Sequence, residues 1–173
     1  RHDGIKAKAV YQFFRAASEG DSVIVLSPDG NRELERFEFG RQGSGDGLCL
    51  ADYLLDVSQA TPDYMAFFVT TVGASVRELA SEWIETGEYL AAHILQALAL
   101  ESAEAFAELL HQRIRSMWGF PDPADIDKKD LFRTMYHGRR YSFGYPACPR
   151  LEDQAYLWRL LEPHKNLGVD LTD

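Results

Sequence analysis

The chain has 173 residues, a length that suits one domain with a real hydrophobic core. Apolar residues make up 46% and charged residues 26% of it, as in ordinary globular proteins. The formal net charge of −9 argues against binding to nucleic acid or to an anionic membrane surface. No apolar run approaches the roughly 20 residues of a membrane-spanning helix, and no signal peptide is visible at the first residue. We therefore expect a cytoplasmic protein without a nucleic-acid or membrane partner.

The first quarter of the chain predicts a β-hairpin. Residues 5–17 mix apolar and polar positions, some at helical spacing, and their state stays open. Residues 19–21 predict a turn, and residues 23–26 form a short β-branched strand. Residues 27–31 carry a hairpin signal, after which the alternating residues 36–39 return as a second strand with one wet face.

The next stretch predicts a loop, a short helix or turn, and a strand. Residues 41–47 contain three glycines but lack the Lys-Ser/Thr of a phosphate-binding loop. Residues 48–55 predict the short helix or turn. The apolar run over residues 64–72 is typical of a central strand that is buried on both faces. Asp63 lies at the start of this run, where the residues alone favour a turn or cap role.

Residues 74–118 predict two helices with a weak point at residues 86–88. Apolar residues recur there at steps of three and four, which predicts buried faces. The predicted faces comprise Val76, Leu79, Ala80, Trp83 and Ile84 in the first helix, and Leu90, Ile94, Leu98, Ala103, Phe106, Ala107, Leu110, Ile114 and Met117 in the second.

Four polar residues lie on the flank of the second helix: Glu104, Glu108, His111 and Arg115. Glu108 and His111 form half of a di-metal Glu-x-x-His pattern, but the second half is missing from the chain. We therefore favour a solvated stripe with contacts between residues four apart.

The C-terminal part predicts short helices. Gly119 and Pro121 end the long helix, and an Asp-x-x-Asp pattern at residue 127 opens a short helix that runs to Tyr136. Residues 152–162 predict an amphipathic helix that ends at Pro163, and residues 167–171 resemble the start of a strand. This order favours an α+β fold over a regular βαβ arrangement, and no Rossmann fingerprint is present.

The chain contains two cysteines, Cys49 and Cys148, far apart in the sequence. They make neither a disulfide framework nor a zinc site, so we expect free thiols in a reducing compartment. Arg140 lies close to Cys148 in the sequence, and a nearby cation lowers the pKa of a thiol. An independent hydrolase with Cys148 as nucleophile is therefore one class of function to test, although no His lies near this residue in the sequence.

The segment from Arg139 to Pro149 predicts neither helix nor strand. Its two prolines lack backbone donors and restrict φ, and Gly144 allows another group to approach the backbone closely. Two arginines begin the segment and two tyrosines follow. A rigid aromatic loop led by a cation suits an anionic or zwitterionic ligand with a flat ring. An ordinary surface crossover between two helices fits the same residues.

The run Arg140-x-x-x-Gly144-Tyr145-Pro146-Ala147-Cys148-Pro149 resembles the AdoMet-binding loop of the activation domain of cobalamin-dependent methionine synthase. Residues 63–70 resemble the central Asp-Tyr strand of that domain, residues 103–111 its long helix, and residues 157–162 the helix after the loop. These segments follow the order of the family over roughly the whole chain.

The resemblance implies a single α+β domain over residues 1–173, bent, with a twisted antiparallel sheet and long flanking helices. It implies that Arg140 binds the methionyl carboxylate of AdoMet. Asp63 and Glu104 would bind the amino group and the positive charge, and Tyr145 would pack beside the sulfonium or the ring. The nucleoside would meet backbone groups of the loop, namely Ser142, Gly144, Pro146 and Ala147.

The resemblance also implies a function. The domain would supply AdoMet to remethylate oxidised, inactive cob(II)alamin, after flavodoxin or a similar reductase supplies an electron. The chain would then be part of a methyltransferase in methionine biosynthesis and catalytically incomplete alone. It contains no Asp-x-His-x-x-Gly run, so cobalamin would be bound by a partner domain or corrinoid protein.

The chain stops at Asp173, where the family continues into a strand and an aromatic pair that help to close the nucleoside site. We therefore expect a truncated piece or a shortened relative with weakened AdoMet binding. The competing hypothesis is a regulatory or scaffolding module that docks on a corrinoid protein without binding AdoMet.

Overall fold

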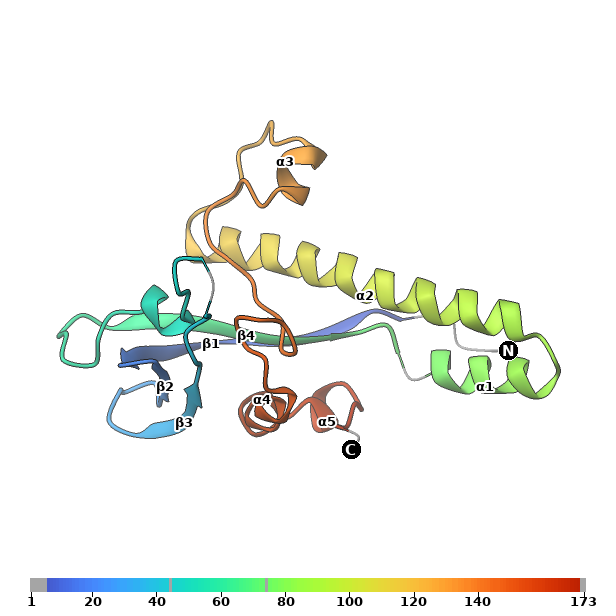
Figure 1. Ribbon diagram of the computed structural model, residues 1–173, viewed down its shortest axis with the longest axis horizontal. Helices are drawn as coiled ribbons and strands as arrows, with labels where there is room; N and C mark the ends of the chain where they lie inside the picture. The colour runs from blue at the N-terminus through green and yellow to red at the C-terminus, as the bar shows by residue number, and fades with distance from the viewer. Residues whose placement is uncertain (1–5, 44, 74, 172–173) are drawn as a thin grey trace. The chain divides into compact units, whose positions relative to one another are not determined.

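The computed structural model describes residues 6–43, 45–73 and 75–171 (Figure 1). Strands, then a helical hairpin, then short helices follow one another along the chain, which confirms the α+β class. In order, the elements are β1 (Lys8–Glu19), β2 (Ser22–Leu26), β3 (Glu33–Glu38), the 3-10 helix η1 (Leu50–Tyr53), β4 (Asp63–Thr71), α1 (Ser75–Glu85), α2 (Tyr89–Trp118), α3 (Lys128–Phe132), the 3-10 helix η2 (Leu151–Asp153), α4 (Gln154–Leu161) and α5 (Pro163–Asn166).

The chain divides into two compact units. The helical unit contains the described residues within 1–9, 70–140 and 167–169, and the sheet unit those within 10–69, 141–166 and 170–173. Each unit has a hydrophobic core of its own. None of the helices in the described part of the chain has the length and apolarity that crossing a membrane requires.

The four strands form an antiparallel sheet in the order β3-β2-β1-β4. β1 and β2 form a hairpin in which Arg15 pairs with Leu26 and Glu19 with Ser22. Gly20 sits in the turn with φ of +59°, a left-handed conformation that favours glycine. The open state of residues 5–17 is thereby settled for the described part, because β1 begins at Lys8.

The prediction that residues 64–72 form a central strand is wrong in its placement. The strand exists as β4, but it lies at one edge of the sheet, and Phe67 is the one residue in it that is fully buried. The apolar run predicted burial on both faces, whereas most side chains of β4 are half-buried.

The core of the sheet unit is built around Phe37 of β3, which is completely buried. Its ring lies 5.2 Å from the ring of Phe67 and 5.1 Å from that of Tyr156, measured between centroids. Leu157 and Leu161 of α4 belong to the same core, as predicted for the apolar side of this helix. The sheet and α4 are thus joined by an aromatic cluster.

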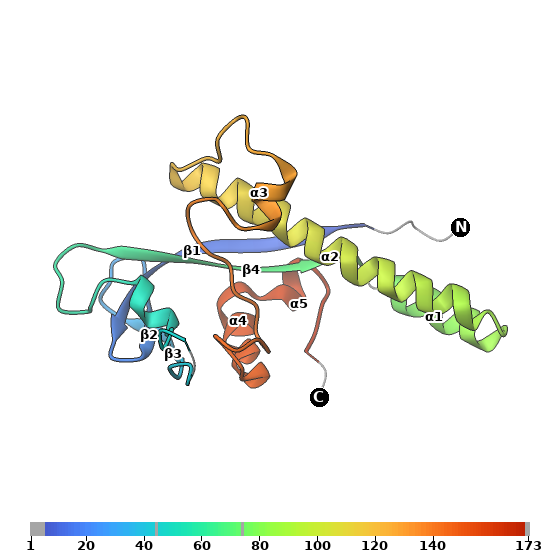
Figure 2. The same cartoon turned by 45° about the horizontal axis from the view of Figure 1, so that its top comes forward.

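The helical unit contains the hairpin of α1 and α2, which lie side by side in both views (Figures 1 and 2). The predicted break at residues 86–88 is confirmed. The predicted face of the first half of α2 is wrong, because Leu90, Ile94 and Leu98 are exposed, Leu90 by 74%. The face that packs on α1 instead consists of Ala92, Leu95 and Ala99. Ile84 and Met117 are also exposed rather than buried.

The C-terminal elements differ from prediction at their ends. Asp127 caps α3 by accepting a hydrogen bond from the backbone N–H of Asp130 at 2.8 Å, as its sequence pattern indicates. The helix ends at Phe132, short of the predicted Tyr136. Residues 167–171 form no strand, so that prediction is wrong.

Truncation of the central ring should identify the core of the sheet unit. We expect Phe37→Ala to lower the free energy of unfolding by about 3–5 kcal/mol, because it leaves a cavity among aromatic rings. Urea unfolding with hydrogen exchange of the β2 amides would measure this loss. Phe132→Ala is the matched control, since Phe132 is 87% exposed. Equal effects of the two substitutions would contradict this description of the core.

Candidate functional site

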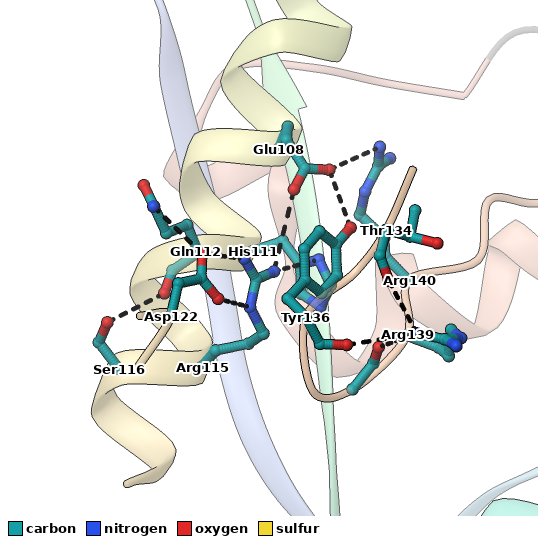
Figure 3. Close-up of polar contacts among 11 residues, drawn as sticks. Glu108, His111, Gln112, Arg115, Ser116, Asp122, Thr134, Tyr136, Arg139 and Arg140 are labelled. Atoms are coloured by element: carbon teal, nitrogen blue, oxygen red, sulfur yellow. Dashed lines mark hydrogen bonds and ion pairs between the residues drawn. The ribbon is translucent and has the colours of Figure 1, made fainter. Parts of the chain in front are cut away.

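Arg140 lies beside two glutamates of α2, Glu104 and Glu108. Figure 3 shows its contact with Glu108. Its Nη1 atom is 3.5 Å from Oε2 of Glu104, and its Nη2 atom is 3.6 Å from Oε2 of Glu108. Glu104 and Glu108 are four residues apart and therefore project from the same side of the helix. Both distances exceed those of ordinary hydrogen bonds, so the guanidinium is held by charge without being locked in a hydrogen-bonded fork. The structure brings together the predicted residues Arg140 and Glu104.

Arg115 occupies the centre of a buried polar network on the same helix. Its Nε and Nη2 atoms donate to both carboxylate oxygens of Asp122, at 2.8 and 2.6 Å. Its guanidinium carbon lies 3.6 Å from the centre of the Tyr136 ring, a cation–π contact. Gln112 donates to the same Asp122 carboxylate at 3.2 Å. The network ties the segment that follows α2 back onto the helix.

The prediction that Arg115 and His111 belong to a solvated stripe is wrong. Arg115 is only 1% exposed and His111 6%. Sequence reasoning missed this network because Asp122 and Tyr136 lie beyond the end of α2, in a segment without periodicity. The available signal was weak: an Arg in the last turn of a helix, followed by a Gly-Phe-Pro-Asp stop.

His111 is neutral in this environment. Its Nδ1 atom lies 2.8 Å from Nη1 of Arg115, and because a guanidinium has only donors, Nδ1 accepts this hydrogen bond. Burial, and next the positive charges of Arg115 and Arg140, lower the pKa of His111 to about 4. Asp122 opposes this shift.

Arg139 points away from the group that surrounds Arg140. Its Nη1 atom donates to the backbone carbonyls of Gly138 at 3.0 Å, Thr134 at 3.3 Å and Tyr136 at 3.4 Å. In Figure 3 these contacts lie apart from Glu108. The two neighbouring arginines therefore have different tasks, since Arg139 holds the backbone that leads to the loop.

The loop of residues 141–149 belongs to the sheet unit and is closed by its own backbone. The N–H of Gly144 donates to the carbonyl of Cys148, and the N–H of Cys148 to that of Tyr145, both at 2.9 Å. Gly144 has φ of +89°, and a Cβ atom there would lie 2.9 Å from Cδ2 of Leu151, so the position requires glycine.

This closed turn separates the predicted loop residues by environment. Ala147 is buried, whereas Tyr145 and Pro146 face solvent and Ser142 is half-buried. The backbone carbonyl of Ser142 accepts a hydrogen bond from the thiol of Cys148 at 2.9 Å. The buried Cys148 thiol thus holds the loop on its inner side, and the ring of Tyr145 is exposed to solvent.

Asp63, at the start of β4, uses both carboxylate oxygens on backbone N–H groups. Oδ2 accepts from Leu55 at 2.9 Å and Oδ1 from Tyr64 at 2.8 Å. Asp63 thus performs the cap role that the residues alone favour, and each oxygen retains a lone pair for another donor. Nowhere in residues 6–43, 45–73 and 75–171 do His, Cys, Asp and Glu side chains gather into a group that could hold a metal ion.

The prediction of a lowered pKa for Cys148 is wrong. Burial, and next the negative charge of Asp153, raise the pKa of this thiol to about 11. Cys49 and Cys148 are both free and buried, as expected for unpaired thiols. A raised pKa and a buried sulfur argue against the hydrolase alternative.

The neutral state of His111 should make stability depend on pH. Because the folded pKa is about 4 and the unfolded value is 6.5, the unfolded chain takes up this proton first as pH falls. The stability contributed by neutral His111 is complete above pH 6.5 and lost towards pH 4, a change of roughly 3 kcal/mol. Chemical unfolding over this range, compared between the unaltered chain and His111→Gln, would measure it.

His111→Gln keeps an acceptor for Arg115 but cannot titrate, so its stability should fall less between pH 6.5 and pH 4. His93→Gln is the matched control, because His93 is an exposed histidine of the same helix. Identical pH slopes for the unaltered chain and His111→Gln would show that His111 does not carry this pH dependence.

Cys148 should react slowly with thiol reagents in the folded chain. A pKa near 11 in place of the ordinary value of 9.0 leaves roughly a hundredfold less thiolate at neutral pH. Alkylation with iodoacetamide, resolved by peptide mass spectrometry, would compare Cys148 in the folded chain and in urea. Fast labelling of folded Cys148 would revive the nucleophile hypothesis.

Comparisons with known proteins agree with one another. A model of the family described as vitamin B12 dependent methionine synthase, activation domain, matches residues 1–173. Methionine synthase of Mycobacterium tuberculosis is 36% identical over 188 residues, which cover 99% of this chain and 15% of the relative. Methionine synthase of Mycobacterium leprae is 32% identical over 182 residues, covering 96% and 15% respectively. The chain therefore spans about 15% of the length of these relatives.

A solved structure, described as the MetH reactivation domain bound to AdoHcy, matches with a TM-score of 0.88 and 31% identity. The match covers 96% of this chain and 53% of the solved one. The similarity in fold confirms the predicted antiparallel sheet with flanking helices. The chain belongs to the family of activation domains of vitamin B12 dependent methionine synthase.

Proposed function

We propose that the chain binds AdoMet and presents its methyl group for reactivation of the cobalamin cofactor of methionine synthase. One observation carries this proposal: a relative of the same fold, 31% identical to this chain, is described as bound to AdoHcy. AdoHcy is what AdoMet becomes when its methyl group leaves. A domain that holds one of these molecules has the contacts needed for the other.

The geometry around Arg140 supports a role in binding the amino-acid end of AdoMet. The net charge of −9 repels a carboxylate, so a local cation must offset it. The planar fork of an arginine binds a carboxylate through two hydrogen bonds, which lysine cannot copy. Arg140 is suited to this task because, within the described part of the chain, its two glutamate partners stand at 3.5 and 3.6 Å and form no short hydrogen bonds with its donors.

Two carboxylates are proposed for the positive charges of the ligand. Glu104 is the more exposed of the two glutamate partners of Arg140. It places an anion beside the cation of Arg140, as the zwitterionic end of AdoMet requires. We assign the ligand amino group to Glu104. Asp63 is proposed as a second acceptor, because its oxygens are oriented by backbone N–H groups of Leu55 and Tyr64.

The loop is proposed to bind the nucleoside. Tyr145 is 64% exposed on a backbone that two hydrogen bonds hold in place. Its ring is available to pack beside a sulfonium or an adenine, where cation–π attraction helps. Backbone groups of Ser142, Gly144, Pro146 and Ala147 are proposed as the remaining contacts.

AdoMet supplies the methyl group, and no general base or nucleophile of this chain is needed in the proposal. The task of the chain is to bind AdoMet, orient its methyl group and release AdoHcy. Cobalamin is proposed to belong to a partner domain, and the electron to come from flavodoxin or a similar reductase. Two free thiols suit the reducing cytoplasm, which is the compartment we propose.

Replacement of Arg140 should separate binding from folding. We expect Arg140→Ala to weaken AdoMet and AdoHcy binding about ten- to a hundredfold, because a hydrogen bond to a charged group is lost. Stability should change by about 0.5 kcal/mol or less, as at other loop positions. Isothermal titration calorimetry with AdoHcy, together with thermal unfolding, would measure both.

Two controls test which arginine carries the effect. Arg133→Ala removes an exposed arginine elsewhere in the helical unit and should leave binding unchanged. Arg139→Ala tests the register, since Arg139 contacts backbone carbonyls instead of the glutamates. Equal weakening by Arg139→Ala and Arg140→Ala would show that the register is wrong. Failure of the unaltered chain to bind either ligand would favour the scaffolding alternative.

A further inference from the structure

Glu108 stands between two arginines and divides its carboxylate between them (Figure 3). Its Oε2 atom faces Nη2 of Arg140 at 3.6 Å and accepts a hydrogen bond from the hydroxyl of Tyr136 at 3.4 Å. Its Oε1 atom is buried, has no hydrogen-bond partner among the residues that the structure describes, and lies 3.9 Å from Nη1 of Arg115. A carboxylate in this position is oriented on both sides by cations.

The two arginines differ in how firmly they are held. Arg115 forms a bidentate pair with Asp122 at 2.6 and 2.8 Å and is buried, so its place does not depend on Glu108. Arg140 has ion pairs with Glu104 and Glu108 in the described part of the chain, and both are longer than hydrogen bonds. Loss of Glu108 would therefore affect Arg140 far more than Arg115.

Glu104 is less suited than Glu108 to anchor Arg140, because its carboxylate also has to bind the ligand amino group. The proposed function gives that task to Glu104, which is also the more exposed of the two glutamates. Glu108 is then the remaining carboxylate that keeps the guanidinium in place. Glu108 itself accepts a hydrogen bond from the Tyr136 hydroxyl at 3.4 Å and lies 3.9 Å from the Arg115 guanidinium.

We propose that Glu108 is a positioning residue that orients Arg140 for the carboxylate of the ligand without touching the ligand itself. This inference rests on the proposed function. The positioning role and a simple effect of charge predict opposite changes in ligand affinity when Glu108 is replaced. If the negative charge of Glu108 merely repelled the ligand carboxylate, its removal would tighten binding, whereas loss of an orienting contact weakens binding.

Calorimetry with two probes would test this. AdoHcy carries the amino-acid end, and 5′-methylthioadenosine has the same nucleoside and sulfur without it. We expect Glu108→Gln to weaken AdoHcy about three- to tenfold, in the range of coupling between residues in one network. Binding of 5′-methylthioadenosine should stay unchanged. Glu108→Asp retains the charge but withdraws it from Arg140, so it should also weaken AdoHcy.

A double variant tests whether Glu108 affects AdoHcy binding through Arg140. If Glu108 acts through Arg140, then Glu108→Gln combined with Arg140→Ala should bind AdoHcy no more weakly than Arg140→Ala alone. Glu101→Gln, at an exposed glutamate of α2, controls for the change in net charge. Thermal unfolding checks that each variant is folded, as we expect because the Arg115–Asp122 pair is unchanged.

The outcomes separate the two proposals. Unchanged or tighter AdoHcy binding by Glu108→Gln would overturn the positioning role and leave the proposed function intact. So would effects of Glu108→Gln and Arg140→Ala that simply add. If the unaltered chain binds no AdoHcy, the proposed function fails and takes the positioning role with it.

Discussion

The buried ion pair between Arg115 and Asp122 is the interaction on which the polar part of the helical unit depends. Two short hydrogen bonds join the guanidinium to the carboxylate, and the Tyr136 ring covers it. Removing one partner would leave an uncompensated buried charge, which costs about 3–5 kcal/mol in proteins. The pair therefore fastens the whole connection from Gly119 to Arg140 onto α2, although that connection has little regular structure.

This arrangement divides electrostatic work among residues of one helix. Arg115 is committed to structure, and its charge is neutralised by Asp122. Glu104 and Glu108 lie further towards the N-terminus of α2 and attract Arg140 without forming short hydrogen bonds. The short, buried pair of Arg115 and Asp122 thus supports the longer contacts of Arg140 with Glu104 and Glu108. The charged groups of these longer contacts can also interact with a zwitterionic molecule. Sites that recognise charged ligands need rigid support and hydrogen-bond donors that are available to the ligand.

The sequence predicted the class of fold and most element types because periodicity and turn residues are local signals. The helical break at residues 86–88, the turn at Gly20 and the hairpin of β2 and β3 follow from such signals. The edge position of β4 and the exposure of Leu90 do not, because they depend on which element covers which face. Apolar periodicity shows that an element has an apolar face but does not show which other element packs against that face.

The candidate site shows the same limit. The resemblance assigned Arg140 and Glu104 to one ligand, and in the structure their side chains lie 3.5 Å apart. Asp122 and Tyr136 were missed because their partner, Arg115, appeared to lie on a solvated flank. A contact between a helix and an irregular segment has no period, so the sequence carries only a weak signal of it. Such contacts emerge only when the chain is folded.

The buried thiol of Cys148 has a consequence for the chemistry of the loop that contains it. A sulfonium methyl donor is an alkylating agent, and a thiolate is the protein group that it would methylate most readily. With a pKa of about 11, about one Cys148 side chain in ten thousand is ionised at pH 7. The remaining thiols donate their proton to the carbonyl of Ser142 and stay within the core. The loop that we propose for binding the methyl donor is thereby protected against methylating itself.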